Sequence, residues 1–173
     1  MARNVEIKAA VMDLRGIERA LDALGAGPPR QLVQEDTFFE GARGRLKLRK
    51  LSPASGELIH YHRPDVTGPK TSEYTLVTTT EPDHLRQALA AAYGVAGVVR
   101  KHRVVRMVGR TRVHLDDVAG LGTFVELEVV LADGEPSEDG VAEAHRLLAA
   151  LGISGDALVA GAYVDLLAGA ARA

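Results

Sequence analysis

Residues 4–9 read NVEIKA, and polar and apolar side chains alternate along them. Because successive side chains of a β-strand point to opposite faces, the segment predicts a strand with one apolar and one polar face. The polar face carries a carboxylate, Glu6, and an ammonium, Lys8. Such a face lies either in water or against the interior of the molecule. The charge pattern of the other strands helps to distinguish these two arrangements.

The composition indicates one globular domain, which we expect to cover residues 1–173. The sequence has no cysteine, which excludes disulfides, thiolate metal sites and cysteine nucleophiles. Charges interrupt the apolar residues near the N-terminus, so we expect neither a signal peptide nor a membrane span, and a cytoplasmic location. A net charge of −2 and an aromatic content of 4% argue against a nucleic-acid partner. We therefore expect no nucleic-acid or membrane partner, and we allow for a homodimer.

Seven further segments alternate in the way that is typical of strands, and turn residues separate most of them. They are residues 34–40, 45–51, 57–64, 72–79, 98–108, 110–118 and 123–131. Short turns between successive strands favour antiparallel pairing, and about eight strands suffice to close a barrel. The sequence therefore predicts an α+β fold built on an antiparallel eight-stranded β-barrel.

Four segments have the apolar spacing of helices. The first follows Asp13, a residue suited to cap a helix, and ends before Gly25. The second covers residues 81–94, the third begins with Ser137 as its expected cap, and the last runs over residues 155–167. We expect these helices to pack against the outside of the barrel.

Charged residues gather on one face of several predicted strands. The same-face sets are Arg45, Lys47 and Arg49; Tyr61 and Arg63; Lys101 and Arg103; Arg110, Arg112, His114 and Asp116; and Glu126 and Glu128. Considered one strand at a time, such a face is typical of the solvent-exposed side of an antiparallel sheet. However, if four helices cover the apolar face of a barrel, the charged face must point inward, where unpaired charge is costly unless a ligand or ion neutralises it.

A polyphosphate with a hard divalent cation would suit such an interior. Phosphate oxygens accept hydrogen bonds from Arg and Lys, and the cation links further oxygens to Asp and Glu. The sequence has no GxxxxGK[ST] loop. We therefore expect side chains, rather than backbone amides at the start of a helix, to hold the phosphates.

An ordered set of motifs over nearly the whole chain resembles the CYTH superfamily, also called triphosphate tunnel metalloenzymes. The motifs are NVEIKA, QEDTFF, GRLKLR, YHRPD, GPKTSEY, VVRKHR, RVHLDDVAGLGTFVELE and AYVDLL. The superfamily includes class IV adenylate cyclases, thiamine triphosphatases and inorganic tripolyphosphatases. The resemblance implies a barrel-shaped tunnel with helices outside that binds a triphosphate substrate, ATP or another, together with Mg²⁺ or Mn²⁺.

The resemblance also implies roles for individual residues. The positions that match phosphate-binding bases are Lys8, Lys47, Arg49, Arg63, Lys101, Arg103 and Arg112, with Lys70 in a loop that can carry a mobile base. Four of these, Lys8, Arg63, Lys101 and Arg103, are expected to act in catalysis. The positions that match metal-binding acids are Glu6, Asp116, Glu126 and Glu128. Tyr163 and Asp165 match a C-terminal segment with either a packing or a catalytic role, whereas His60 and His62 are expected on the surface or in packing.

Asn4 departs from the ExExK pattern of the superfamily, because it stands where the first glutamate belongs. An amide oxygen can coordinate a cation, but it adds no charge and cannot act as a base. We expect one metal at Glu6, Glu126 and Glu128, and weaker binding of a second.

The function that we expect is that of a metal-dependent enzyme acting on a triphosphate. The first candidate is a class IV-type adenylate cyclase that converts ATP to cyclic AMP and pyrophosphate. The alternatives are a triphosphatase acting on inorganic tripolyphosphate, thiamine triphosphate or a nucleoside triphosphate, and a non-catalytic sensor that binds nucleotide or polyphosphate. No set of residues in the sequence specifies adenine, so these remain open.

Overall fold

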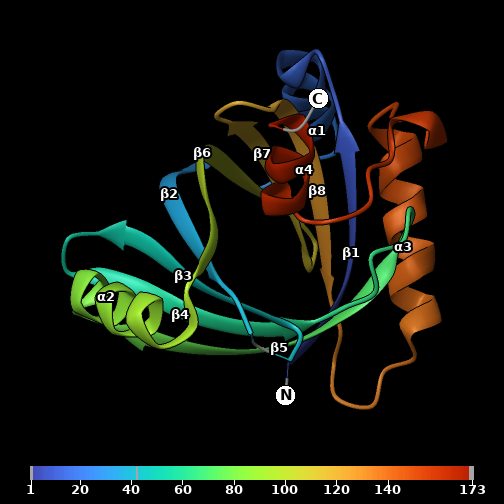
Figure 1. Cartoon of the computed structure of the whole chain (residues 1–173). Helices are drawn as coiled ribbons and strands as arrows, with labels where there is room; N and C mark the ends of the chain where they lie inside the picture. The colour runs from blue at the N-terminus through green and yellow to red at the C-terminus, as the bar shows by residue number, and fades with distance from the viewer. Residues whose placement is uncertain (1, 42, 172–173) are drawn as a thin grey trace.

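The computed structural model describes residues 2–41 and 43–171. Its strands are β1 (Ala2–Ala10), β2 (Arg30–Phe39), β3 (Arg45–Ser52), β4 (Ser55–His62), β5 (Lys70–Thr79), β6 (Val95–Val108), β7 (Thr111–Val118) and β8 (Gly122–Val130). They form a closed barrel in the order β1-β5-β4-β3-β2-β6-β7-β8, and every neighbouring pair is antiparallel (Figure 1). The predicted fold class is confirmed.

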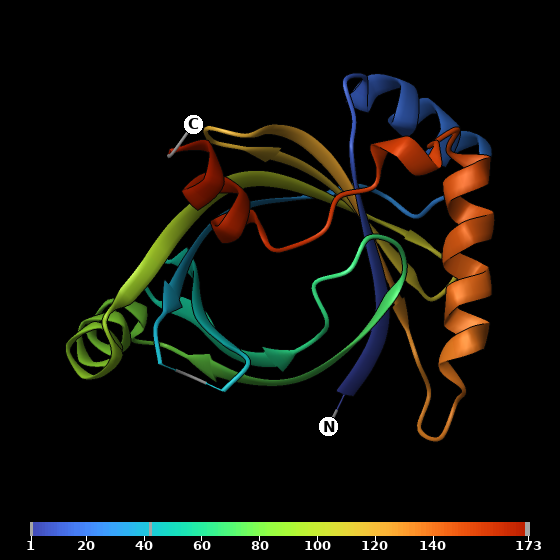
Figure 2. The same ribbon diagram turned by 45° about the vertical axis from the view of Figure 1, so that its right-hand side comes forward.

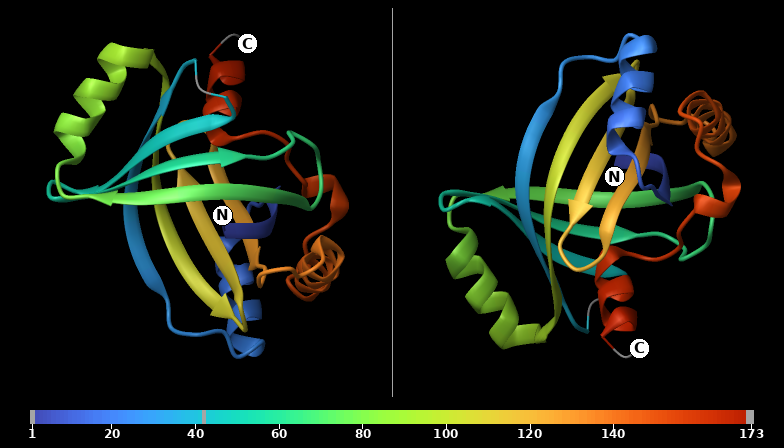
Figure 3. Two further views of the ribbon diagram at one scale, coloured as in Figure 1. Left: turned by 90° about the horizontal axis from the view of Figure 1, so that it is seen from below. Right: turned by 90° about the horizontal axis from the view of Figure 1, so that it is seen from above.

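The helices lie outside the barrel wall or across its end. They are α1 (Leu14–Ala23), α2 (Pro82–Tyr93), α3 (Ser137–Ala150) and α4 (Tyr163–Ala170), with a short 3₁₀ turn, η1, at Gly155–Ala157. Figures 2 and 3 show α2 on one flank of the barrel and α3 on the opposite flank, with α1 beside α3 in Figure 2. None of the helices in the described part of the chain has the length and apolar run needed to cross a membrane.

The main hydrophobic core lies between the barrel and two helices. Apolar residues of β1, β7 and β8 pack there against α1 and α3, for example Ile7 and Leu127 against Leu21 and Leu148. Both Leu21 and Leu127 are completely buried. Because side chains alternate along a strand, the apolar outer face leaves the polar residues of the same strands pointing into the barrel.

The predicted helix boundaries need two corrections. Asp13 caps α1 as expected and accepts a hydrogen bond from the Gly16 amide at 2.9 Å. Ser137, in contrast, is the first residue of α3 and makes no cap; its hydroxyl accepts hydrogen bonds from Arg3 and Thr71, both at 3.1 Å. The serine therefore ties the start of α3 to the barrel wall instead of satisfying the amides of the helix.

The last predicted helix is interrupted. Between η1 and α4 the chain is extended and runs beside β1, where the Val159 amide donates to the Lys8 carbonyl at 2.9 Å. Gly161 then adopts a positive φ of 79°, which other residues rarely do. This backbone pairing replaces helical hydrogen bonds and carries the chain across one end of the barrel before α4 begins (Figure 2).

Gly140 sets the close approach of α3 to the barrel, and replacing it should weaken the fold. A Cβ at this position would lie 2.8 Å from carbons of both Val5 and Leu131. We expect Gly140→Val to lower the free energy of unfolding by about 1–3 kcal/mol because it overpacks this contact. Urea denaturation followed by circular dichroism measures the change.

The matched control is Gly155→Ala, since no atom lies within 4 Å of the added carbon there. It should leave stability unchanged or raise it by less than about 1 kcal/mol. Equal stability of Gly140→Val and the wild type would contradict the proposed packing of α3.

Candidate active site

The barrel encloses a cavity of about 320 Å³ that residues of all eight strands line. Within the described ranges, eight basic and five acidic side chains line it, a formal excess of three positive charges. Most of the charged strand faces therefore point inward, whereas Arg110 precedes β7 and pairs with Glu135 and Glu143 instead. Seven of the predicted phosphate bases line this space, namely Lys8, Lys47, Arg49, Arg63, Lys101, Arg103 and Arg112, together with the predicted metal acids Glu6, Glu126 and Glu128.

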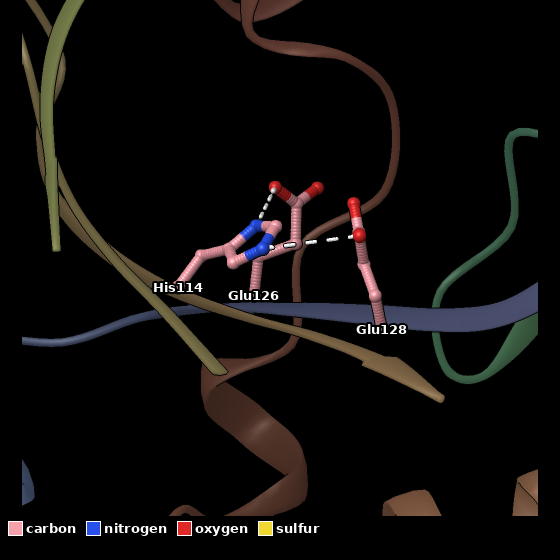
Figure 4. A group of neighbouring side chains, drawn as sticks. All are labelled: His114, Glu126 and Glu128. Carbon is pink, nitrogen blue, oxygen red and sulfur yellow. Dashed lines mark ion pairs between the residues drawn. The ribbon is translucent and has the colours of Figure 1, made fainter. Parts of the chain in front are cut away.

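One wall of the cavity is acidic and is formed by β1, β8 and β7. Strand register places Glu6 opposite Glu128. The next inward row places Glu126 between Lys8 of β1 and His114 of β7. Figure 4 shows His114 with the two glutamates of β8, and one ligand-type atom from each of the three lies within 4.8 Å of the others. Antiparallel pairing thus brings together residues that are far apart in the chain.

The charge states of these carboxylates suit a divalent cation. Burial alone would raise the pKa of Glu126, but the neighbouring His114 and Lys8 hold that pKa well below its usual range. The pKa of Glu128 is also lowered, despite its burial. Glu6 differs: burial raises its pKa to about 6 even though Arg63 pairs with it. Two ionised glutamates and the buried oxygen of Asn4, which has no hydrogen-bond partner within residues 2–41 and 43–171, are donors of the type that Mg²⁺ and Mn²⁺ accept. The residues present therefore fit such a cation.

The opposite wall is basic and is organised by Asp36 of β2, which is 1% exposed. Its carboxylate accepts hydrogen bonds from Lys47 at 3.0 Å and from two nitrogens of Arg49 at 2.9 and 3.0 Å. The Lys101 ammonium is 3.9 Å away. Burial would raise the pKa of Asp36, but Arg49 and Lys47 outweigh it and hold that pKa well below its usual range. Asp36 of β2 therefore gathers three bases from two other strands, β3 and β6, around one point.

Asp116 shares a face of β7 with Arg112 and His114, and its side chain is completely buried. It accepts two hydrogen bonds from Arg103, at 2.6 and 2.5 Å, and one from the Tyr163 hydroxyl at 2.8 Å. It is not among the described residues that line the cavity. The structure places Asp116 where it orients Arg103 and anchors α4, apart from the cluster of His114 and the two glutamates of β8, so its predicted role as a metal ligand remains a prediction.

The chain between η1 and α4 supports two of the bases. The Gly161 carbonyl accepts hydrogen bonds from Lys8 at 3.0 Å and from Arg63 at 3.2 Å. The Lys8 ammonium also lies 4.0 Å from the centre of the Tyr163 ring. Burial lowers the pKa of Lys8 to about 8. Burial and the nearby Arg103 lower that of Lys101 to about 7. Both lysines therefore exchange a proton near neutral pH.

Two other predicted residues lie at the edges of the site. Lys70 does not sit in a loop: it is the first residue of β5, is 3% exposed and donates to the Val66 carbonyl at 3.2 Å. It shares the inward face of β5 with Ser72 but is absent from the described lining of the cavity. Asp165 accepts from Arg45 at 2.7 Å, which ties α4 to β3.

The sequence reasoning missed Asp36, although the residue lies within the quoted motif QEDTFF. Gln34, Asp36 and Phe38 alternate along β2 and all line the cavity. Applying the period-two rule to this strand would have placed the aspartate inside the barrel. The alternation along β2 could not identify the three basic partners of Asp36, because these contacts depend on the register with β3 and on the position of β6.

Comparisons with known proteins agree with this architecture. A model of the CYTH domain matches residues 2–163. A Methanocaldococcus jannaschii protein named "Putative adenylate cyclase" is 27% identical over 170 residues, which cover 94% of this chain and 97% of that protein.

Two solved structures share the fold. The PH1012 protein of Pyrococcus horikoshii has a TM-score of 0.82 at 22% identity, with 95% of this chain and 99% of that one covered. A Hippeastrum protein, named a "putative adenylyl cyclase" and described as having a dominant triphosphatase activity, has a TM-score of 0.64 at 18% identity, with 96% and 95% covered. At these identities the likeness concerns the fold alone.

Removing the charge of Asp36 should destabilise the barrel. We expect Asp36→Asn to lower the free energy of unfolding by about 3–5 kcal/mol, because Lys47 would lose its carboxylate partner and Arg49 would keep only Glu57, at 3.8 Å. Chemical denaturation measures this loss, and added tripolyphosphate should recover part of it. Glu35→Gln is the control, since Glu35 pairs with the exposed Arg100 and should change stability by less than about 1 kcal/mol. Equal effects of the two variants would refute the role given to Asp36.

The lowered lysine pKa values predict proton uptake when an anion binds. An anion favours the charged form of a lysine, so binding at pH 8 should raise the pKa of Lys101 from about 7 and draw protons from the buffer. Calorimetry with tripolyphosphate and a chelator, in buffers of different ionisation enthalpy, counts these protons. Lys101→Met should reduce the uptake by up to about one proton. Lys50→Met, which removes an ammonium paired with Asp83 of α2, should leave the count unchanged.

Proposed function

The chain belongs to the CYTH domain family, and on that premise we propose that it is a divalent-metal-dependent enzyme that cleaves a triphosphate inside the barrel. The observation that carries the proposal is one cavity inside the barrel in which predicted phosphate bases face three glutamates. A bound polyphosphate would neutralise the excess positive charge, and its oxygens would accept hydrogen bonds from guanidinium and ammonium groups. Interior charge of this kind is costly without such a ligand.

The two walls would bind different parts of the substrate. Glu126, Glu128 and Glu6 would hold a cation that neutralises charge on phosphate oxygens. Arg49, Lys47 and Lys101, which surround Asp36, would bind the phosphate groups from the other side. Because Asp36 already fixes these bases, little reorganisation is needed when charge develops on the leaving phosphates.

The first candidate reaction is cyclisation of ATP. The 3′-hydroxyl oxygen would attack the α-phosphorus, the bond from that phosphorus to the bridging oxygen would break, and pyrophosphate would leave with the electron pair. Lys8, with a pKa of about 8, has a neutral fraction that can accept the hydroxyl proton. Two observations support a nucleotide: the name of the Methanocaldococcus relative, and the apolar residues Leu32 and Val105 in the lining of the cavity, which suit an organic group.

The second candidate is hydrolysis of a triphosphate with release of orthophosphate. The description of the Hippeastrum protein supports this reaction, because that protein shares the fold and combines a cyclase name with triphosphatase activity. The same bases would stabilise the leaving group in either case. The reactions differ in the nucleophile, water instead of a ribose hydroxyl, and in the phosphorus atom that it attacks.

Product analysis tests the proposal. The protein is incubated with ATP, thiamine triphosphate or tripolyphosphate, each with Mg²⁺ or Mn²⁺, and cyclic AMP, pyrophosphate and orthophosphate are resolved. Cyclic AMP with equimolar pyrophosphate supports the cyclase, and orthophosphate without cyclic AMP supports the triphosphatase. Tight binding of all three compounds without any product would reject an enzyme in favour of a sensor.

Single variants separate binding from turnover. Arg49→Ala should weaken triphosphate binding, and Glu126→Gln should lower kcat by about 10²–10³-fold while substrate still binds. Arg100→Ala is the matched control because Arg100 is 67% exposed and pairs with Glu35 on the outer surface. If Arg49→Ala binds triphosphate as tightly as the wild type, the basic wall does not bind phosphate.

A further inference from the structure

His114 has no function in the reaction described above, yet it lies at the centre of the acidic wall. Its Nδ1 is 3.8 Å from an oxygen of Glu126, and its Nε2 is 3.8 Å from an oxygen of Glu128 (Figure 4). The ring therefore lies beside both glutamates, and each of its nitrogens faces one carboxylate.

Neither nitrogen makes a hydrogen bond to these carboxylates, because 3.8 Å is beyond hydrogen-bonding distance. The His114 side chain is 5% exposed. Its Nδ1 has no hydrogen-bond partner among the described residues. Buried polar atoms are nearly always satisfied, so an unpaired ring nitrogen beside the Glu126 carboxylate indicates a missing partner.

A second unpaired atom lines the same cavity. The Oδ1 atom of Asn4 has no hydrogen-bond partner in the described part of the chain, and Asn4 is 4% exposed. Asn4 shares the inward face of β1 with Glu6, which pairs in register with Glu128. An unsatisfied nitrogen and an unsatisfied oxygen thus flank the glutamates from two strands. The amide oxygen offers an electron pair, and so does the ring nitrogen of neutral His114 that carries no proton. A cation requires such donors, whereas a bound anion does not.

We propose that His114 is a ligand of the divalent cation, together with Glu126 and Glu128, and that the site consequently prefers Mn²⁺ to Mg²⁺. This inference rests on the proposed metal dependence and specifies its ion. Mg²⁺ takes oxygen ligands almost exclusively, whereas first-row transition ions also accept imidazole. Carboxylate and phosphate oxygens suit Mn²⁺ as well as Mg²⁺, so the imidazole is the ligand that distinguishes between these two ions.

The nitrogen ligand can be detected directly in the wild-type protein. Mn²⁺ is added to the protein without triphosphate, and electron spin-echo envelope modulation is recorded. A directly coordinated imidazole gives modulation from ¹⁴N, which should change to the ¹⁵N pattern when the protein is made with ¹⁵N-labelled histidine. The measurement needs neither activity nor a folded variant.

A variant then tests the preference between ions. His114→Gln should remove the modulation and weaken Mn²⁺ binding by at least about tenfold. It should change Mg²⁺ binding by less than about threefold, because the glutamine carbonyl restores an oxygen ligand. Calorimetry gives both affinities, and thermal unfolding verifies the fold. His102→Gln on β6 is the control, since this exposed histidine pairs in register with Asp117 and does not line the cavity.

Bound Mn²⁺ without histidine modulation would overturn the inference, as would a wild-type protein that binds Mg²⁺ as tightly as Mn²⁺ or fails to bind Mn²⁺ at millimolar concentration. The outcomes also separate this inference from the proposed function. Turnover without histidine modulation would support the proposed enzyme and show that His114 is not a metal ligand. Histidine modulation without turnover would keep the metal site and reject the enzyme.

Discussion

Repulsion among the bases inside the barrel governs how its polar side chains are arranged. More basic than acidic side chains line the barrel, and like charges repel strongly where water is scarce. Asp36 reduces this repulsion on one wall, where its carboxylate accepts hydrogen bonds from both Lys47 and Arg49. Asp116 holds Arg103 in the same way. These carboxylates hold the bases in place, and the remaining positive charge is left for a ligand.

The helices explain why the charges are inside. α1 and α3 cover the outer face of β1, β7 and β8 with apolar contacts, so the polar residues of these strands face the interior. The end of the chain contributes in a different way. Its extended segment crosses one end of the barrel, and the Gly161 carbonyl accepts hydrogen bonds from Lys8 and Arg63. A backbone oxygen thus supports two bases without adding a formal charge.

Much of this was predictable from local patterns. Alternation along residues 110–118 and 123–131 predicted both the strands and the inward direction of Arg112 and Glu126. The predictions failed where a side chain makes a hydrogen bond to a residue that is distant in the sequence. Ser137 was expected to cap α3, but its hydroxyl accepts from Arg3 and Thr71 of neighbouring strands. A capping preference is local, and a contact from another strand can override it.

The alternation of polar and apolar residues showed which side chains share a face of each strand, because alternation is a property of each strand alone. The sequence also located Asn4 as the departure from the family pattern. Only the tertiary structure decided which charges meet. Asp36 contacts Lys47 through the β2–β3 register, and His114 stands opposite Glu126 through that of β7 and β8. Register sets the distances between side chains of different strands, and those distances determine whether a carboxylate binds a base or remains available to a cation.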